Sequence, residues 1–157
     1  MKEEMLVNKL IQLGYTIASA ESCTGGMFSS TIINVPNASK VISSSIVTYS
    51  NEAKQKYCNV KKETIDTYGV VSENTAREMA IGIAKECDAN VGVSFSGYAG
   101  PATDVGDTTV GIVCFGFCIE GKVCSYTKVF KGGRMSVRRK SVNFAINKLI
   151  KLLENNN

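Results

Sequence analysis

The segment Ala20-Glu21-Ser22-Cys23-Thr24-Gly25-Gly26 follows a short run of strand-forming residues and precedes a helical pattern. We predict a strand over 16–20, a glycine-rich turn, and a helix over 27–33. Such a turn exposes the Ser22 hydroxyl at the end of a strand. It also directs free backbone N–H groups toward whatever group lies beside the start of the helix.

The rest of the chain alternates strands and helices around this unit. Strands are predicted at 45–49, 91–96, 110–119 and 123–130, and helices at 5–13, 51–57, 63–68, 72–87 and 135–153. Helices between the early strands imply parallel crossovers, whereas the tight turn at 120–122 makes the last two strands an antiparallel hairpin. We therefore predict one α/β domain over 1–157, with a mixed sheet of about five strands and helices on both faces.

Composition indicates a globular protein that binds neither nucleic acid nor membrane. The 157 residues are 44% hydrophobic with a net charge of +4, whereas dedicated nucleic-acid binders carry a denser basic stripe. No apolar run approaches the ~20 residues that span a bilayer, and the N-terminal residues lack the apolar core of a secretory signal. We expect a soluble, cytoplasmic protein.

The cysteine pattern favours reduced thiols over disulfides. Six cysteines are scattered through apolar segments, and none forms a C-x-x-C pair. We predict that most pack as small core residues. Because the chain also contains no histidine, a zinc site is not expected. We predict no metal and no cofactor.

The absence of histidine also removes the usual general base of serine and cysteine hydrolases. If Ser22 is a nucleophile, Lys54 is the best remaining base, and Tyr49 would hydrogen-bond Lys54 or relay a proton. Lys54 must then be neutral, which requires burial or a nearby cation to lower its pKa from about 10.4. The alternatives are an ordinary N-cap serine and a solvated lysine. Cys23 is a rival nucleophile, because helix N-termini acidify thiols.

Three predicted strand ends carry small or hydroxyl-bearing residues, namely 22–26, 49–51 and 96–100. Sites of open α/β sheets gather at the C-terminal ends of strands, so these loops converge if their strands are neighbours. Backbone N–H groups of 23–26 would bind an oxyanion, and Gly25 and Gly26 would let a ligand approach the backbone. A Walker loop is excluded because its Lys-Ser/Thr ending is missing.

Three charged residues have both a functional and an ordinary interpretation. Glu21 would orient Lys54 or contact substrate, or it is simply an acidic residue at a helix entry. Arg134 and Arg138 would bind a phosphate through their guanidinium groups, or they belong to a basic helix surface.

Five blocks of the chain together resemble the C-terminal domain family of the competence/damage-inducible protein CinA, whose members include nicotinamide mononucleotide amidohydrolases. The blocks are 20–26, 47–54, 69–73, 96–101, and Gly132-Gly133-Arg134 with Val137-Arg138. They span nearly the whole chain in order, which makes the match more specific than any single block. One departure is Gly133, where the family commonly has an aspartate. Many members also carry an N-terminal domain related to molybdopterin-binding proteins. The 157 residues have no room for it, so activities tied to it, such as ADP-ribose pyrophosphatase, are not expected.

The resemblance implies a three-layer α/β/α domain and a Ser/Lys amidohydrolase. Carried over by position, Ser22 is the nucleophile, Lys54 the base and Tyr49 its partner. The substrate-binding residues expected from the turn chemistry and the resemblance together are Glu21, Cys23, Thr24, Gly25, Gly26, Asn51, Ser96, Gly97, Ala99, Gly100, Arg134 and Arg138.

The function implied by the resemblance is hydrolysis of nicotinamide mononucleotide to nicotinic acid mononucleotide and ammonia. The expected partner is thus a small nucleotide substrate, and the assembly that the resemblance suggests is a homodimer. The alternative is a nucleotide-binding module, associated with competence or damage, that does no chemistry. A DNA-associated role is disfavoured by the modest charge and the absence of tryptophan.

Overall fold

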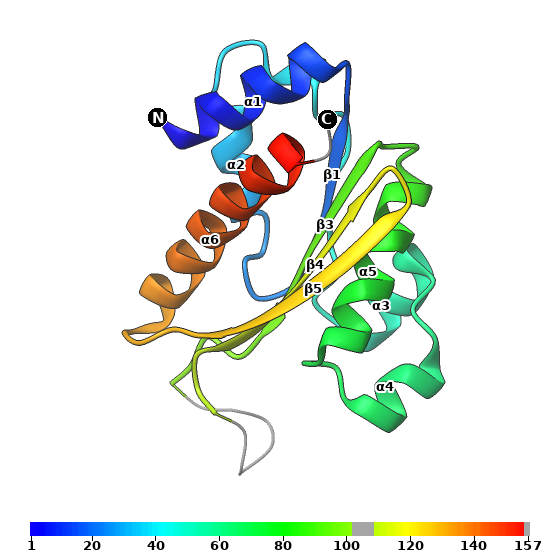
Figure 1. Cartoon of the computed structure of the whole chain (residues 1–157). Helices are drawn as coiled ribbons and strands as arrows, with labels where there is room; N and C mark the ends of the chain where they lie inside the picture. The colour runs from blue at the N-terminus through cyan, green and yellow to red at the C-terminus, as the bar shows by residue number, and fades with distance from the viewer. Residues whose placement is uncertain (102–108, 156–157) are drawn as a thin grey trace.

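The computed structural model describes residues 1–101 and 109–155. Its elements follow the expected alternation (Figure 1). The helices are α1 (Lys2–Leu13), α2 (Met27–Ile33), α3 (Asn51–Cys58), α4 (Lys62–Tyr68), α5 (Glu73–Glu86) and α6 (Arg134–Asn155), with a short 3-10 helix, η1 (Ala38–Lys40). The strands are β1 (Ile17–Glu21), β2 (Ile46–Val47), β3 (Val91–Gly97), β4 (Ile112–Ile119) and β5 (Lys122–Val129).

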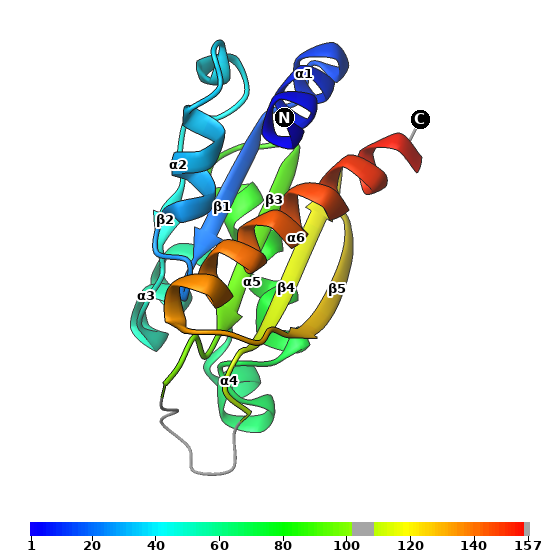
Figure 2. The ribbon, with the colours of Figure 1, turned by 90° about the vertical axis from the view of Figure 1, so that its left-hand side faces the viewer.

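The five strands form one mixed sheet in the order β2-β1-β3-β4-β5. Strand β1 pairs in parallel with both β2 and β3, whereas β3–β4 and β4–β5 are antiparallel. Helices α1, α2 and α6 cover one face of the sheet, and α3, α4 and α5 cover the other (Figures 1 and 2). The predicted three-layer α/β/α architecture, with its late antiparallel hairpin, is confirmed.

Strand β1 is buried along its whole length, and its side chains alternate between the two faces. Ala18 and Ala20 pack in the cluster that includes Cys58 of α3 and Met79 of α5. Ile17 belongs to the other cluster, which includes α1, α2 and α6. This alternation puts consecutive residues at the end of β1 on opposite faces of the sheet.

Helix α5 lies directly on the sheet because the strands beneath it carry small residues. A Cβ atom on Gly116 of β4 would lie 2.1 Å from the carbonyl oxygen of Ala76, and one on Gly92 of β3 would lie 2.1 Å from that of Ala80. The Ser94 hydroxyl, on the same face, donates a 2.6 Å hydrogen bond to the Ala76 carbonyl. The opposite face is filled instead by a phenylalanine cluster on β3, β4, α2 and α6.

The largest difference from the predicted elements is β2, which has two residues rather than the five expected. After Val47 the chain makes one more contact with β1, from the Thr48 amide to the Glu21 carbonyl. It then turns into α3, whose N-cap is Ser50. All six cysteines are free thiols, and four of them are buried, as predicted. Within the described residues, no helix has the length and apolar character needed to cross a membrane.

Candidate functional site

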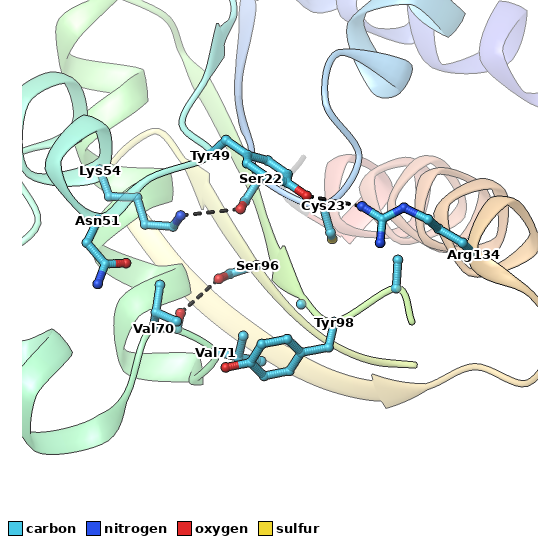
Figure 3. A pocket seen from close by; sticks show the side chains of 12 residues that line it. Ser22, Cys23, Tyr49, Asn51, Lys54, Val70, Val71, Ser96, Tyr98 and Arg134 are labelled. Atoms are coloured by element: carbon cyan, nitrogen blue, oxygen red, sulfur yellow. Dashed lines mark hydrogen bonds between the residues drawn. The ribbon is translucent and has the colours of Figure 1, made fainter. Parts of the chain in front are cut away.

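The carboxyl ends of β2, β1 and β3 are neighbours at one edge of the sheet. Their loops converge, as expected, around a cavity of about 190 Å³ (Figure 3). The predicted residues that line this cavity are Ser22, Cys23, Tyr49, Asn51, Lys54, Ser96, Gly97, Ala99 and Arg134. The other predicted residues, Glu21, Thr24, Gly25, Gly26, Gly100 and Arg138, do not line it.

Ser22 and Lys54 meet at the inner wall of this cavity. The Lys54 ammonium lies 3.3 Å from the Ser22 hydroxyl oxygen and donates a second hydrogen bond, of 2.7 Å, to the Thr48 carbonyl (Figure 3). Lys54 is only 1% exposed, although it stands in the first turn of a surface helix. Ser22 follows β1 and projects on the face of the sheet that α3 covers. Lys54 extends from α3 toward that face, so the two side chains meet.

Burial of Lys54 disfavours its charged form. It lowers the pKa of the amine from 10.5 to about 8, with desolvation as the main cause. Neither of the two ion pairs among the described residues includes Lys54. A neutral amine therefore forms far more readily here than on a solvated lysine, which is the property that a general base needs.

The turn that carries Ser22 is held tightly at both ends. The Ser22 amide donates to the Phe95 carbonyl of β3, and the Gly25 amide donates back to the Ser22 carbonyl, each at 3.0 Å. Gly25 and Gly26 have φ values of 53° and 97°, in the left-handed region that glycine adopts without strain. The Gly25 amide is thus already used inside the turn, which removes it from the expected oxyanion donors. The amides of Cys23, Thr24 and Gly26 stay candidates.

Cys23 is poorly suited to act as the nucleophile. Its side chain is 5% exposed, and burial raises the pKa of the thiol to about 12. The thiolate, which is the reactive form, is therefore strongly disfavoured despite the nearby start of α2. The environment favours Ser22 over its neighbour.

Tyr49 lies at the cavity mouth, not beside the base as expected. The side chain is 63% exposed, and its hydroxyl accepts a 3.1 Å hydrogen bond from Arg134 (Figure 3). A second N–H of Arg134 donates to the Gly100 carbonyl at 2.8 Å. Tyr49 and Arg134 thus bridge three loops across the opening of the cavity. Lys54 instead takes the backbone of Thr48 as its partner.

Glu21 neither orients Lys54 nor reaches the cavity. It is 1% exposed, and its carboxylate accepts hydrogen bonds from the amides of Phe28 and Ser29 in the first turn of α2. The reason is strand alternation, which points Glu21 toward α2 and Ser22 toward α3. Glu21 is a buried cap that stabilises the start of the helix.

Thr24 and Arg138 also differ from their expected roles as ligand contacts. Thr24 is fully buried, and its hydroxyl has no hydrogen-bond partner among the described residues. The Arg138 guanidinium is occupied by the carbonyl oxygens of Cys23 and Thr24, outside the cavity. It packs against the turn rather than into the site.

Three residues that were not predicted to belong to the site also line the cavity, namely Val70, Val71 and Tyr98. Val70 is held by its carbonyl, which accepts a 2.8 Å hydrogen bond from the buried Ser96 hydroxyl (Figure 3). All three residues lie within blocks 69–73 and 96–101 of the family resemblance, and this position is the sequence signal that could have identified them. The Thr48 carbonyl could not be predicted as the partner of Lys54, because a residue of any type carries a backbone carbonyl.

The described residues provide no cluster of the side chains that commonly bind metal ions. Over 1–101 and 109–155, histidine, cysteine, aspartate and glutamate form no group of three or more that could bind one. The polar side chains that line the cavity instead carry hydroxyl groups, a carboxamide, an amine and a guanidinium, which suit an organic substrate with an electrophilic carbon and an anionic group.

Comparison with known proteins identifies the family. Residues 1–153 match the CinA C-terminal domain. The chain belongs to the CinA C-terminal domain family. A relative from Clostridium acetobutylicum, whose name is that of a competence-damage inducible protein, is 49% identical over 144 residues. A CinA-like protein from Kosmotoga olearia is 45% identical over 144 residues. In both cases the match covers 92% of this chain but 35% of the relative, so the chain spans about a third of the length of these curated relatives.

Solved structures of CinA-family proteins have the same fold over most of their length. A CinA superfamily protein from Klebsiella pneumoniae matches with a TM-score of 0.95 at 30% identity, covering 98% of this chain and 96% of that one. A competence or damage-inducible protein from Enterobacter asburiae matches with a TM-score of 0.94 at 35% identity, covering 97% and 96%. The fold and the family are therefore shown by sequence and structure together.

Proposed function

We propose that this CinA-family domain is an amidohydrolase that converts nicotinamide mononucleotide and water to nicotinic acid mononucleotide and ammonia. One observation supports the proposal above all others. A lysine that is 1% exposed and has a lowered pKa lies 3.3 Å from a serine hydroxyl at the wall of a cavity. This pairing of a hydroxyl nucleophile with an adjacent base is the arrangement that acyl transfer requires.

In the first step Ser22 attacks the carboxamide carbon. Neutral Lys54 accepts the hydroxyl proton as the bond from Oγ to carbon forms, and the amide oxygen becomes an oxyanion. The free amides of the turn would stabilise that charge, and each such donor typically contributes about 3 kcal/mol. Lys54 then returns the proton to the departing nitrogen as the C–N bond breaks, which releases ammonia and leaves an acyl-enzyme.

In the second step water cleaves the acyl-enzyme. Lys54, neutral again after protonating the departing amide nitrogen, removes a proton from the attacking water. Collapse of the second tetrahedral intermediate breaks the bond to Oγ, and the proton returns to Ser22. The products are a carboxylic acid and the original enzyme, and the reaction needs neither an oxidant nor a metal.

The cavity supports a substrate with an aromatic amide on an anionic stem. Its volume of about 190 Å³ is below that of sites that enclose a whole drug-sized ligand, so it would hold the ring alone. Val70, Val71 and Tyr98 provide apolar walls for such a ring. Ribose and phosphate would then lie at the mouth beside the exposed Arg134. Two of the five N–H donors of Arg134 contact Tyr49 and Gly100, so others can bind an anion.

The direct test is release of ammonia from nicotinamide mononucleotide by the purified protein. We expect turnover of the mononucleotide, and weaker turnover of the riboside that lacks the phosphate. Equal kcat/KM values for both compounds would contradict the placement of the phosphate at Arg134. Tight binding of the mononucleotide with no ammonia released would favour the non-catalytic nucleotide-binding module instead.

The pH profile tests the role of Lys54 as a base. Its pKa of about 8 predicts that kcat/KM rises about tenfold per pH unit below pH 8 and levels off above it, because only the neutral amine accepts the proton. The profile is measured by initial rates of ammonia release across the neutral and alkaline range. A rate that is constant or falls as pH rises toward 8 would contradict this assignment.

A further inference from the structure

Arg138 connects α6 to the turn that carries Ser22. Its Nε donates a 2.9 Å hydrogen bond to the carbonyl of Cys23, and its Nη2 donates a 3.0 Å bond to the carbonyl of Thr24. The two acceptors are consecutive carbonyls, and they lie 115 and 114 residues from Arg138 in the sequence. One planar guanidinium therefore fixes the orientation of two consecutive peptide groups.

The second of these peptide groups leads directly back to Ser22. In a trans peptide the C=O and N–H groups point in opposite directions. When Arg138 holds the Thr24 carbonyl, the N–H of Gly25 points away from α6, and it donates a 3.0 Å hydrogen bond to the Ser22 carbonyl. By the same geometry, holding the Cys23 carbonyl sets the direction of the Thr24 N–H, one of the candidate oxyanion donors.

The fit of Arg138 to the turn is close. A Cβ atom on Gly25 would lie 3.4 Å from Nη2 of Arg138, so the guanidinium packs against the bare backbone of that glycine. The buried Glu21 carboxylate, which precedes the turn, accepts hydrogen bonds from the amides of Phe28 and Ser29, which follow it. The turn is thus fixed from both of its flanks, and Arg138 supplies the contact from α6.

We propose that Arg138 is a positioning residue that acts through the 23–25 backbone to hold the Ser22 hydroxyl and the oxyanion-binding amides in reactive geometry. This inference rests on the proposed function, because it assumes that Ser22 is the nucleophile. It assigns to Arg138 a role distinct from that of Arg134. Arg134 lines the cavity and is placed to contact substrate, whereas Arg138 does not line the cavity.

The first experiment separates positioning from substrate binding. Arg138→Ala is expected to lower kcat about 100-fold, the loss typical of a misplaced reacting group, while KM changes by less than about threefold. Arg138→Lys should recover only part of kcat, because one ammonium cannot reproduce the planar fork on two carbonyls. Arg139→Ala, at an exposed neighbouring position, is the matched control and should leave both constants unchanged. A rise in KM at constant kcat would overturn the proposal and make Arg138 a substrate contact.

Two further readouts exclude a general loss of structure. Guanidinium chloride, far below denaturing concentrations, should restore part of the kcat of Arg138→Ala. The free guanidinium ion would bind the Cys23 and Thr24 carbonyls in place of the missing side chain. The rate at which a fluorophosphonate labels Ser22 should fall in Arg138→Ala in parallel with kcat. In this labelling Oγ displaces fluoride from phosphorus and Lys54 accepts the proton, so the rate reports the reactivity of Ser22 without the natural substrate.

The labelling also distinguishes failure of the inference from failure of the proposed function. If wild type is labelled but releases no ammonia from nicotinamide mononucleotide, the proposed substrate is wrong, and the labelling rates of the variants still decide the role of Arg138. If Arg138→Ala is labelled as fast as wild type, the positioning role is wrong and the amidohydrolase is unaffected. If wild-type Ser22 is not labelled, the nucleophile assignment is wrong, and the positioning role falls with it.

Discussion

Replacement of Ser22 by alanine is expected to lower the rate of ammonia release by at least about 10⁴-fold. The substitution removes the atom that forms the bond to the carboxamide carbon, and no second hydroxyl contacts Lys54 among the described residues. What activity is left would come from water activated by Lys54 and from substrate binding, which persist without the nucleophile. The measurement is single-turnover and steady-state release of ammonia by both proteins.

Cys23→Ala is the matched control for Ser22→Ala. The two residues are adjacent in the same turn, and both line the cavity. Because burial raises the pKa of the Cys23 thiol to about 12, its loss should change the rate by less than about threefold. The reverse pattern, with activity kept in Ser22→Ala and lost in Cys23→Ala, would transfer the nucleophile role to the thiol.

The fold of Ser22→Ala should be intact, so that lost activity is not lost structure. The backbone bond from residue 22 to the Phe95 carbonyl does not depend on the side chain. The hydroxyl contributes one hydrogen bond, with Lys54. We therefore expect the free energy of unfolding to change by about 1 kcal/mol or less, as measured by denaturant titration.

The fold could be predicted because its signals are local. The segments 16–20 and 91–96 contain no charged residue, which is typical of central strands, and the helical spacing of 72–87 indicates a helix that covers them. The Glu120-Gly121 turn alone makes the last strand pair antiparallel. Strand β2 is shorter than predicted, because residues 48 and 49 have strand propensity but belong to the turn before α3.

The chemistry of the site could be predicted only in part. The absence of histidine and the order of the motifs indicated Ser22 and Lys54 as a pair. The burial of Lys54 was not predictable, because it depends on which face of β1 is covered by α3. The same choice of face turns Glu21 away from the cavity, since the two residues at the end of β1 alternate.

The arginines show where sequence reasoning stops. Arg134 and Arg138 are four residues apart on one helix and had the same expected role. The structure separates them, since Arg134 contacts Tyr49 and Gly100 at the cavity mouth and Arg138 contacts the Ser22 turn. These contacts join residues that are 34 to 115 positions apart in the sequence, and they depend on the angle at which α6 crosses the sheet.

Replacement of Lys54 by methionine is expected to abolish turnover while leaving the domain folded. Methionine fills a similar volume but accepts no proton, so Ser22 loses its base and the rate should fall at least about 10³-fold. Lys56→Met is the matched control, because Lys56 is exposed on the same helix and should tolerate the change. Activity within tenfold of wild type in Lys54→Met would contradict the assignment of the base.

The stability of Lys54→Met carries an independent signature of the same lowered pKa. In the folded state this pKa is about 8, against 10.5 for a solvated lysine. At about pH 7 the amine is protonated in both states, so the native protein bears the full cost of burying a charge. Between those two pKa values the unfolded chain binds more protons than the native one. Wild-type stability should therefore rise with pH over this interval by about 3 kcal/mol in total.

Methionine cannot show this rise, because it does not titrate. At about pH 7 its effect on stability is a balance of two opposing contributions. Removing the buried charge stabilises the fold, whereas the Thr48 carbonyl loses its 2.7 Å donor at a cost of about 1–3 kcal/mol. The two proteins should thus have similar free energies of unfolding near neutral pH and diverge in favour of wild type as pH rises toward 10. Parallel stability curves across that range would mean that Lys54 stays protonated in the native state, and the Ser/Lys mechanism would lose its base.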